Sequence, residues 1–509
     1  MSLDLAFGIA RTGLQATQRA LAQVSQNIAN ADTPGYTRKD RAPVALQGAD
    51  RPMGLRLGEA QRLVDDALVA ERDGRGSEAA AARLRETLLG FVEAAHGRPE
   101  DGDSLGDVVA GLRAAFIGLR AAPGEAGVQR DVLRAARDVA TRFNEVAGAI
   151  GKAREQAQRG IGEELARVNQ GLRGIADLST RIRADRSAGL STADLEDQRD
   201  TALSTLSRSL PVKALRQADG GILLIARGGL ALPLDAGRDA FSTQAASIGP
   251  QSFHGPAGTL PGVRLQGVDV TAQLAGGRLA ELVRLRDSTL PRYQAEMDVA
   301  ASAMATRLDA QGLRLFTDAG GAVPDTSLPY VAGGQLGFAN AIRVNPALLT
   351  DPRLLRDGTQ DVAAATGGPT AFTRNPAGGP AGFTTLLDRV LDHSLGETVR
   401  AGTAWAALPS TGLGPDGGLS SPFLPPGSIE AYSAAVTGAQ TADRAAAAAD
   451  RTRAEAMQRG LDARFQQQSG VDPDAEMARL VQLQNAYAAN ARVMNTAQQM
   501  WDQLLNMVR

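Results

Sequence analysis

The stretch that decides the fold spans residues 3–36, LDLAFGIARTGLQATQRALAQVSQNIANADTPGY. Its apolar residues recur at alternating steps of four and three, the 3.5-residue period of a supercoiling helix. Residues 477–508 repeat this alternation near the other end of the chain. We therefore predict an antiparallel pair of terminal helices, with the rest of the chain as an excursion that goes out and returns. The first stripe is Leu3, Phe7, Ala10, Leu14, Thr17, Leu21, Val24 and Ile28, and the second is Leu480, Leu483, Tyr487, Asn490, Met494, Ala497, Trp501, Leu504 and Val508.

The polar faces of both expected helices carry few charges. A solvated helix face is usually rich in Lys, Arg and Glu, whereas the core of a subunit interface is depleted of charge. We predict that neighbouring subunits cover these faces. The pair should be marginal in an isolated subunit and order fully on assembly. The charges are Asp4, Arg11 and Arg19 in residues 3–31, and Arg479, Arg492 and Asp502 in residues 477–508.

The composition excludes several classes of protein. The 54 Lys and Arg residues nearly cancel the 56 Asp and Glu residues, so bulk charge does not point to nucleic acid or membranes. There is no cysteine, which excludes disulfides, thiolate metal sites and cysteine nucleophiles. No apolar run is long enough to span a membrane. A cleavable signal peptide is not expected either, because the N-terminus has no basic region followed by an apolar block.

The first helix is expected to end near Asn30, because Pro34 and Gly35 follow within the sequence NADTPGY. A proline disfavours helical geometry in the residue before it, and Pro-Gly fits the central positions of a type II turn. By physics alone this stretch is a helix stop. Short extended pieces are expected in residues 38–62, which are punctuated by Gly and Pro.

A long helical region is expected from about residue 80 to Leu210. Several apolar stripes at helical spacing follow one another there, which indicates an elongated helical bundle. The stripes are Leu84, Leu88, Phe91 and Ala95; Val108, Leu112, Phe116 and Leu119; Val128, Val132, Ala135, Val139, Phe143, Val146 and Ile150; and Ile161, Leu165, Val168, Leu172, Ile175 and Ile182.

The remaining segments alternate between β pattern and helix. Residues 211–274 are expected to form a small β excursion, with helix returning from Gly277 to about Leu315. Residues 321–425 are rich in Gly, Pro and Thr, and we predict a separate β-rich outer domain there. Helix should resume at Ile429, before a break in which Asp472 caps the last helix.

These segments predict a mainly α fold with β-rich insertions, in the α+β class. It has paired N- and C-terminal coiled-coil helices, an elongated helical bundle and a separate outer β-rich domain. Three domains are expected: a terminal assembly domain, a bundle domain with a β hairpin excursion near residues 211–274, and the outer domain. Their bounds are 1–36 plus 470–509, 37–320 plus 426–469, and 321–425.

Two motifs suggest chemistry but fail on their context. The stretch 412–417, GLGPDG, has the letters of a dinucleotide fingerprint, yet no strand precedes it and Pro415 does not open a helix. Asp472, Asp474 and Glu476 look like the start of a calcium loop, but its glycine and its distal glutamate are absent. Acidic residues in the first turn of a helix already have a reason in the helix dipole.

The histidines do not form a recognisable site. His96, His254 and His393 lie in unrelated segments without a ligand or triad partner at motif spacing. No nucleophile elbow, metalloprotease helix or P-loop is present. We therefore predict no catalytic residue, no cofactor and no metal, and a protein that is not an enzyme.

Both ends of the chain resemble a known family. NIANADTPGYTR and SGVDPDAEMARLVQLQNAYAANARVMNTAQQMWDQLL are similar to the ends of bacterial flagellar axial proteins, namely the rod, hook and hook-associated proteins. Three internal stretches narrow the resemblance to the flagellar hook-associated protein 1 family. They are VNQGLRGIADLSTRI with LEDQRDTALSTLSRSLPV, then LAGGRLAELVRLRDSTLPRYQAEMD, and AQGLRLF. The resemblance covers most of residues 1–320 and 426–509. Residues 321–425 contain no motif that resembles this family.

The resemblance implies a structural adaptor at the junction between hook and filament, outside the cell. Such a protein would be exported through the flagellar type III apparatus, which also explains the missing signal peptide. The family's assembly role is carried onto the two end segments only. The implied interface residues are Leu3, Phe7, Leu14, Leu21, Val24, Ile28, Asn30, Pro34, Gly35, Tyr36, Met477, Leu480, Leu483, Tyr487, Met494, Trp501 and Leu504.

The partners implied by the resemblance are copies of the chain itself, the hook protein and hook-associated protein 3. A flagellar export chaperone would hold the C-terminal helix before export. Two alternatives remain open at this point. One is a hook or distal-rod-like axial protein, against which the helical region of residues 80–210 argues. The other is a filament protein with enzymatic activity in residues 321–425.

Overall fold

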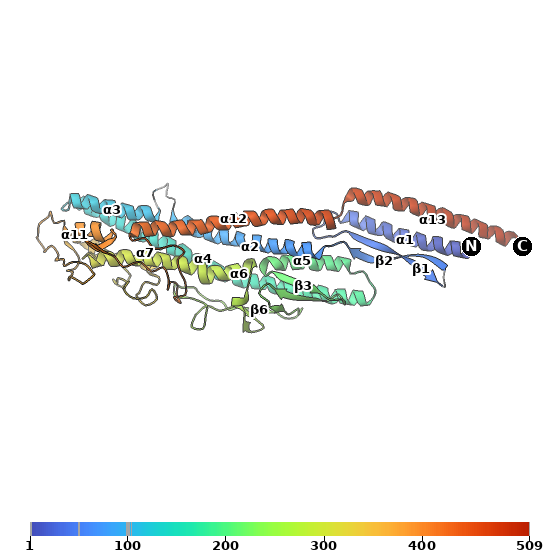
Figure 1. Ribbon diagram of the computed structural model, residues 1–509, viewed down its shortest axis with the longest axis horizontal. Coiled ribbons are helices and arrows are strands. Elements are labelled where there is room, and N and C mark those ends of the chain that lie inside the picture. The colour runs from blue at the N-terminus through green and yellow to red at the C-terminus, as the bar shows by residue number, and fades with distance from the viewer. Residues whose placement is uncertain (1–2, 49–50, 98–101, 103, 508–509) are drawn as a thin grey trace.

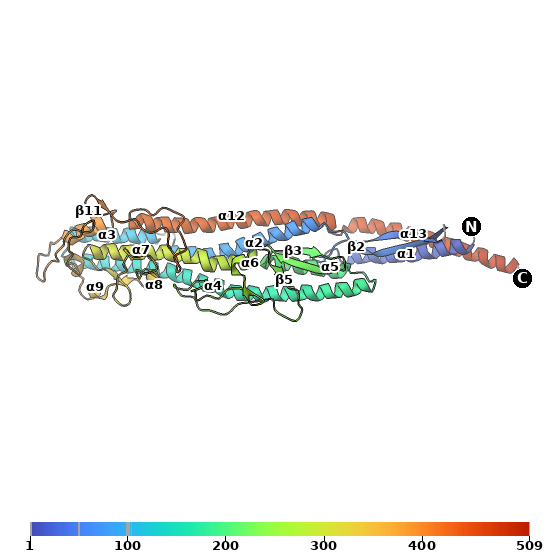
Figure 2. The ribbon, with the colours of Figure 1, turned by 60° about the horizontal axis from the view of Figure 1, so that its bottom comes forward.

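The computed structural model describes residues 3–48, 51–97, 102 and 104–507. The molecule is a long rod, with helices running along its length and both chain ends at the same tip (Figure 1). A second view shows the same elongated outline, with α13 reaching past the start of α1 (Figure 2). The protein is therefore elongated, as expected from its helical stripes.

The predicted pair of terminal helices is present. Helix α1 and helix α13 pack side by side and antiparallel beyond the end of the bundle (Figure 1). A long antiparallel hairpin, β1–β2, lies along α1. We call these four elements the terminal module. They are α1 (Leu3–Ala29), β1 (Lys39–Gly48), β2 (Arg51–Arg62) and α13 (Pro473–Met507).

The hairpin differs from the expected domain division. The sequence places residues 37–62 in the helical bundle domain, because short extended segments do not indicate which element they pack against. In the structure β2 packs mainly on α1 and meets the bundle at α5. A two-stranded sheet is marginal by itself, so this packing supports the hairpin.

The bundle is built from helices α2 to α7, with the short η1, and from α12, which returns to the terminal module. The 62-residue α4 runs along most of its length. Asp65 caps α2 by accepting hydrogen bonds from two backbone N–H groups, and Ser104 forms a capping box with Asp107 at the start of α3. The helices are α2 (Asp66–Glu93), η1 (Ala94–His96), α3 (Leu105–Ala121), α4 (Ala126–Ser187), α5 (Ala193–Ser209), α6 (Gly277–Arg284), α7 (Leu290–Ala310) and α12 (Ile429–Ser469).

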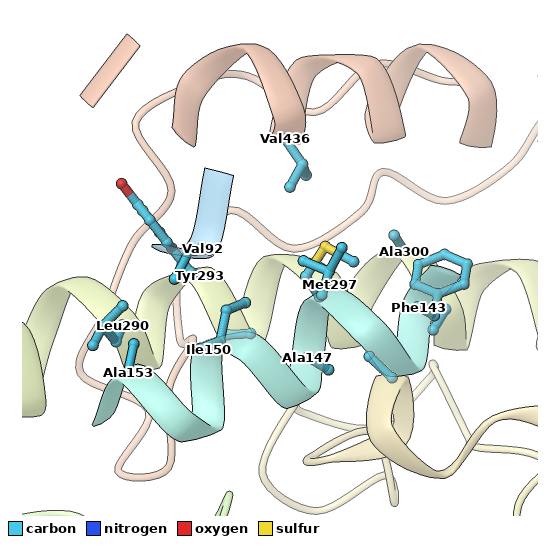
Figure 3. Close-up of a cluster of buried hydrophobic side chains, with 14 of the residues drawn as sticks. Val92, Phe143, Ala147, Ile150, Ala153, Leu290, Tyr293, Met297, Ala300 and Val436 are labelled. Carbon is cyan, nitrogen blue, oxygen red and sulfur yellow. The ribbon is translucent and has the colours of Figure 1, made fainter. Parts of the chain in front are cut away.

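Helix α7 forms the centre of the bundle, and nearly all of its residues are buried. Phe143 and Ile150 of α4 pack against Met297 of α7, and Val436 of α12 covers the cluster from the opposite side (Figure 3). The apolar stripes predicted in α3 and α4 supply this core, since Val139, Phe143 and Ile150 are fully buried with the rest. The helical periodicity thus identified the core faces of α3 and α4 correctly, whereas Phe91 of the stripe predicted in α2 is 46% exposed.

The expected helix from Gly277 to Leu315 is interrupted. A π-helical turn, η4 (Leu285–Thr289), separates α6 from α7, and the helix ends at Ala310. Pro291 explains the interruption, because proline has no N–H to donate to the carbonyl of residue 287.

Residues 211–274 form two small three-stranded antiparallel sheets, as the glycine-punctuated pattern predicted. In the first, the central strand buries Leu224 completely against the bundle. The strands are β3 (Val212–Arg216), β4 (Ile222–Ala226), β5 (Ala231–Leu232), β6 (Phe241–Ser242), β7 (Arg264–Leu265) and β8 (Val268–Asp269), followed by the short helix η3 (Thr271–Gln273).

Residues 321–425 differ from the expected separate β-rich domain. Their strands are two or three residues long, and short helices and loops make up the rest. The buried Tyr330, Leu355 and Leu386 belong to the same continuous hydrophobic core as the bundle. Gly and Pro here break up short helices rather than strands. The elements are β9 (Phe316–Thr317), α8 (Phe338–Ala341), β10 (Arg343–Val344), α9 (Pro346–Thr350), α10 (Leu354–Asp357), α11 (Thr385–Arg389), the π-helical turn η5 (Val390–Ser394), β11 (Thr398–Arg400) and β12 (Thr403–Ala404).

A buried carboxylate fastens this segment to α7. Asp298 is fully buried and accepts hydrogen bonds from the Tyr330 hydroxyl at 2.7 Å, the Gly337 N–H at 2.8 Å and the Ala339 N–H at 2.9 Å. The Gln294 amide donates a fourth. Burial raises the pKa of the Asp298 carboxyl to about 6, in spite of these donors.

Candidate assembly interface

The seam between α1 and α13 is packed less tightly than the bundle core. Among the described residues of the pair, Val24 is the only large apolar side chain that is fully buried, and it is accompanied by the small side chains of Ala10, Ala16 and Ala497. The structure thus brings the two predicted stripes together without closing them off. The half-buried residues of the predicted set are Leu14, Leu21, Ile28, Leu480, Leu483, Tyr487 and Met494.

One point of the seam shows close helix contact. Gly13 of α1 faces Asn490 of α13, and a Cβ on this glycine would lie 3.3 Å from the side-chain amide. Nearby, the Gln18 amide lies 3.5 Å from the Tyr487 hydroxyl, at the outer limit of a hydrogen bond. The polar positions of the two stripes therefore lie in the seam, as the sequence suggested.

Other predicted interface residues are exposed. Phe7 is 38% exposed, Trp501 46% and Met477 52%, and Pro34 and Gly35 are also exposed. Asn30 and Tyr36 are half-buried, while the side chains of Leu3 and Leu504 lie outside the described part of the chain.

Three further apolar side chains on the outside of α13 were missed. Val481, Val493 and Met500 are each about half exposed. They lie off the predicted stripe, and only their position on a helix with few charges could have indicated them. Exposed apolar side chains on a helix with few charges match the charge depletion that is typical of the core of a protein interface.

The stretch after α1 joins the terminal module to the bundle. Residues 36–39 are extended, so alternate side chains point in opposite directions. Tyr36 donates a hydrogen bond to Asn27 at 2.9 Å, and Arg38 pairs with Glu476 of α13 at 2.7 Å. Both contacts lie within the terminal module. We call residues 36–39 the strap.

The other two strap side chains bind helix α5 of the bundle. The Thr37 hydroxyl donates to Asp197 at 2.6 Å, and its N–H donates to the same carboxylate at 3.1 Å. Lys39, almost completely buried, pairs with Asp197 at 3.0 Å and also with Asp194. Its ammonium lies 3.6 Å from the centre of the Tyr36 ring, in cation–π geometry. The strap thus holds three elements, with Tyr36 on α1, Arg38 on α13, and Thr37 and Lys39 on α5.

Arg62 at the end of β2 completes this charged cluster. It pairs with Asp197 at 2.8 Å and with Asp200 of the same helix. Burial alone would lower the pKa of the Arg62 guanidinium, but the nearby Asp200 and Asp197 raise it, so the cation is stabilised. The pKa of the Tyr36 hydroxyl is raised, chiefly by burial and further by the negative charges of Asp194, Asp197 and Glu476.

A glycine allows the turn to approach α5. Gly35 has φ of +81°, which favours glycine, and a Cβ there would lie 2.4 Å from the Thr201 hydroxyl oxygen. The NADTPGY turn is therefore more than the helix stop inferred from physics alone, because it also contacts the bundle.

The carboxylates of α5 were not identified as partners of the strap. The motif LEDQRD was noted only for its resemblance, since a sequence does not show which acidic helix a distant basic segment meets. The available signal was the spacing of Asp194, Asp197 and Asp200, which places three carboxylates on one helix face.

The motifs weighed for chemistry remain without a site. Asp472 accepts hydrogen bonds from the N–H groups of Asp474 and Ala475, so it caps α13 as expected. Residues 412–417 form a loop with one isolated bridge, and no helix opens there. His96 is buried against Gln440 at 2.7 Å. Within the described residues no group of acidic and histidine side chains could hold a metal ion, and no helix is long and apolar enough to cross a membrane.

Comparisons with known proteins agree with this arrangement. Residues 98–323 match the family model of the flagellar hook-associated protein FlgK helical domain. Residues 7–37 match that of the flagella basal body rod protein, and residues 463–507 that of the flagellar basal body rod FlgEFG protein C-terminal. Both ends of the chain are thus similar to flagellar axial proteins, and its helical region is similar to that of the flagellar hook-associated protein FlgK. The resemblance drawn from the motifs is thereby confirmed.

Similar proteins include "Flagellar hook-associated protein 1" of Bacillus subtilis (strain 168), which is 23% identical over 98% of this chain and 97% of the relative. The structure of the flagellar hook junction protein FlgK from Burkholderia pseudomallei is 20% identical, with a TM-score of 0.39 over 50% of this chain and 45% of that one. The helical-domain match argues against the hook or distal-rod alternative. The chain is a structural component of the bacterial flagellum.

Proposed function

We propose that this chain is the structural adaptor that joins hook to filament, and that it polymerises through the outer face of the α1–α13 pair. The observation that carries the proposal is that Val481, Val493 and Met500, which lie on different sides of α13 outside the predicted stripe, are exposed apolar side chains on a helix pair with few charges. An exposed apolar face of this kind is costly in water and favours burial between subunits.

The burial of the seam supports the same assignment. The bundle closes over a continuous core, whereas the terminal pair leaves most of its stripe half-buried. A pair with so little fully buried apolar surface gains stability when neighbouring subunits cover it. The predicted interface residues therefore divide into half-buried residues, such as Leu14 and Leu483, and exposed residues, such as Phe7 and Trp501.

The proposed partners are copies of this chain laterally, the hook protein on one side and hook-associated protein 3 on the other. A flagellar export chaperone would hold the exposed α13 before export through the type III apparatus. The absence of cysteine supports export in an unfolded state, because no disulfide has to be reduced and reformed.

We also propose a revised division of the chain. The assembly unit comprises residues 3–62 with 473–507, since the β1–β2 hairpin packs on α1. The second unit is the bundle together with residues 321–425, since both share one core.

The test is a pair of charge substitutions on the outer face. Val481→Glu with Val493→Glu adds two carboxylates where neighbouring subunits are expected, so the variant should be secreted but not retained on the hook. The assay is electron microscopy of flagella in a strain that lacks its own copy of this protein.

The matched control places the same substitutions elsewhere. Ile117→Glu with Leu349→Glu changes two apolar side chains of similar exposure on the bundle. This control should restore filaments. If the α13 variant restored filaments equally well, the outer face of α13 would not be the assembly interface.

A further inference from the structure

The terminal module and the bundle do not share a hydrophobic core. Among the described residues, the continuous core contains side chains from α2 to α12 but none from α1, β1, β2 or α13. Buried apolar residues of the module, such as Val24, are not part of that core. The attachment between the two parts therefore depends on other contacts.

Those contacts are polar and concentrated on one face of α5. Thr37 and Lys39 of the strap and Arg62 of the hairpin all bind Asp197, with Asp194 and Asp200 on either side. Gln26 of α1 reaches Asp194 at 3.4 Å. Four side chains from three segments of the module thus converge on three carboxylates of one helix.

The strap is also fixed to the module itself and to the end of α12, where the chain returns to the module. Arg38 binds Glu476, which is fully buried, and the Arg38 N–H donates to the Ser469 carbonyl at 2.8 Å at the end of α12. The Asn27 amide donates to the Lys39 carbonyl at 3.0 Å and to Glu476 at 3.2 Å. Tyr36 and Arg38 bind the module, while Thr37 and Lys39 bind α5. Because these contacts alternate along the strap, the strap cannot slide along α1 to release α5.

Contacts of this kind set orientation more than they set stability. Charge-assisted hydrogen bonds are directional and short-ranged, whereas apolar contacts tolerate small rotations. A buried ion pair gains little net stability over apolar packing, and its better-supported role is to select one arrangement among several. Breaking it also exposes almost no apolar surface here, so the unlocked state remains soluble.

We propose that the strap and Arg62 form an electrostatic hinge lock. Bound to Asp194, Asp197 and Asp200, they hold the terminal module at one fixed orientation relative to the bundle. Without these ion pairs the module swings about residues 62–66 and 469–473, while each part keeps its own fold. The lock is a property of the single chain and does not depend on which partners the assembly uses.

Pulsed electron spin resonance distances test the hinge directly. The chain contains no cysteine, so Ala184→Cys on α4 and Ala488→Cys on α13 provide two exposed labelling sites without further changes. In the otherwise unchanged full chain, the distance distribution between the labels should be narrow. With Lys39→Met and Arg62→Met it should broaden, with helix content by circular dichroism unchanged.

The controls separate loss of the lock from loss of the fold. Arg85→Met removes a bundle ion pair, to Glu281 at 2.8 Å, and should leave the distribution narrow. Asp194→Asn with Asp197→Asn opens the lock from the bundle side and should broaden it even if the strap variant folds poorly. A narrow, unshifted distribution in both lock variants would overturn the proposal, and so would a broad distribution in the unchanged chain.

Discussion

Gly35→Ala should weaken the joint between the terminal module and the bundle by about 2–5 kcal/mol. Part of this cost is backbone strain, since an L-residue at a left-handed φ costs roughly 1–2 kcal/mol. The remainder is steric, because the new Cβ would lie 2.4 Å from the Thr201 hydroxyl oxygen. Overpacking of this kind costs roughly 1–3 kcal/mol.

A matched glycine separates the two contributions. Gly189 after α4 has φ of +69° and no neighbour within 4 Å of a built Cβ. Gly189→Ala should therefore cost only the strain, about 1–2 kcal/mol. Adding Thr201→Ala to Gly35→Ala should remove the steric part, because the next atom, the Thr201 Cβ, lies 3.6 Å away in ordinary contact.

The assay is native-state hydrogen exchange, which reports the free energy of local opening. The Thr37 N–H, bonded to Asp197, reports the joint, and the Leu190 N–H, bonded to the Asp185 carbonyl, reports the end of α4. The opening free energy of the double variant, Gly35→Ala with Thr201→Ala, is compared with that of the single variant Thr201→Ala. Equal costs for Gly35→Ala and Gly189→Ala, or no recovery in the double variant, would refute the close approach of the turn to α5.

Three further predictions concern stability. Burial raises the pKa of the Asp298 carboxyl to about 6. Its contribution to the free energy of unfolding is therefore full below the pKa of this carboxyl in the unfolded chain, and it is lost as the pH rises through 6. The loss amounts to about 3 kcal/mol. The urea midpoint of unfolding should therefore fall between pH 4 and pH 7, and it should fall less in Asp298→Asn than in the unchanged chain. Identical pH profiles for the two proteins would contradict this. Asp472→Ala removes the N-cap of α13 and should lower the free energy of local opening at the start of this helix by about 1 kcal/mol, measured as faster amide exchange. Asp502→Ala should leave this exchange unchanged. Phe116→Ala should lower the free energy of unfolding by about 3–5 kcal/mol, and its exposed neighbour Ile117→Ala by under about 0.5; similar losses would refute the burial.

Local patterns predicted the helices and their pairing because the deciding information lies within each segment. The 3.5-residue stripe of residues 3–28 identified both the helix and the need for a partner, and the fully buried Phe143 and Ile150 were found from the helical period alone. The cap at Asp472 was also readable, since it depends on the next few residues only.

Long-range polar contacts could not be predicted in the same way. Lys39 and Asp197 are far apart in the sequence, and nothing local distinguishes a lysine that is almost completely buried from a solvated one. The same limit explains residues 321–425, where Gly and Pro mark breaks but do not show which element they interrupt. Asp298 organises that segment from α7, at a distance that no pattern reveals.

The central claim is that neighbouring subunits bury the outer face of the α1–α13 pair, and a structure of the assembled hook–filament junction tests it most directly. We expect Val481, Val493 and Met500, now about half exposed, to be buried against adjacent copies, with both terminal helices ordered over their whole length. A junction in which these side chains remain in solvent, while the contacts between subunits run through residues 211–425, would contradict the claim.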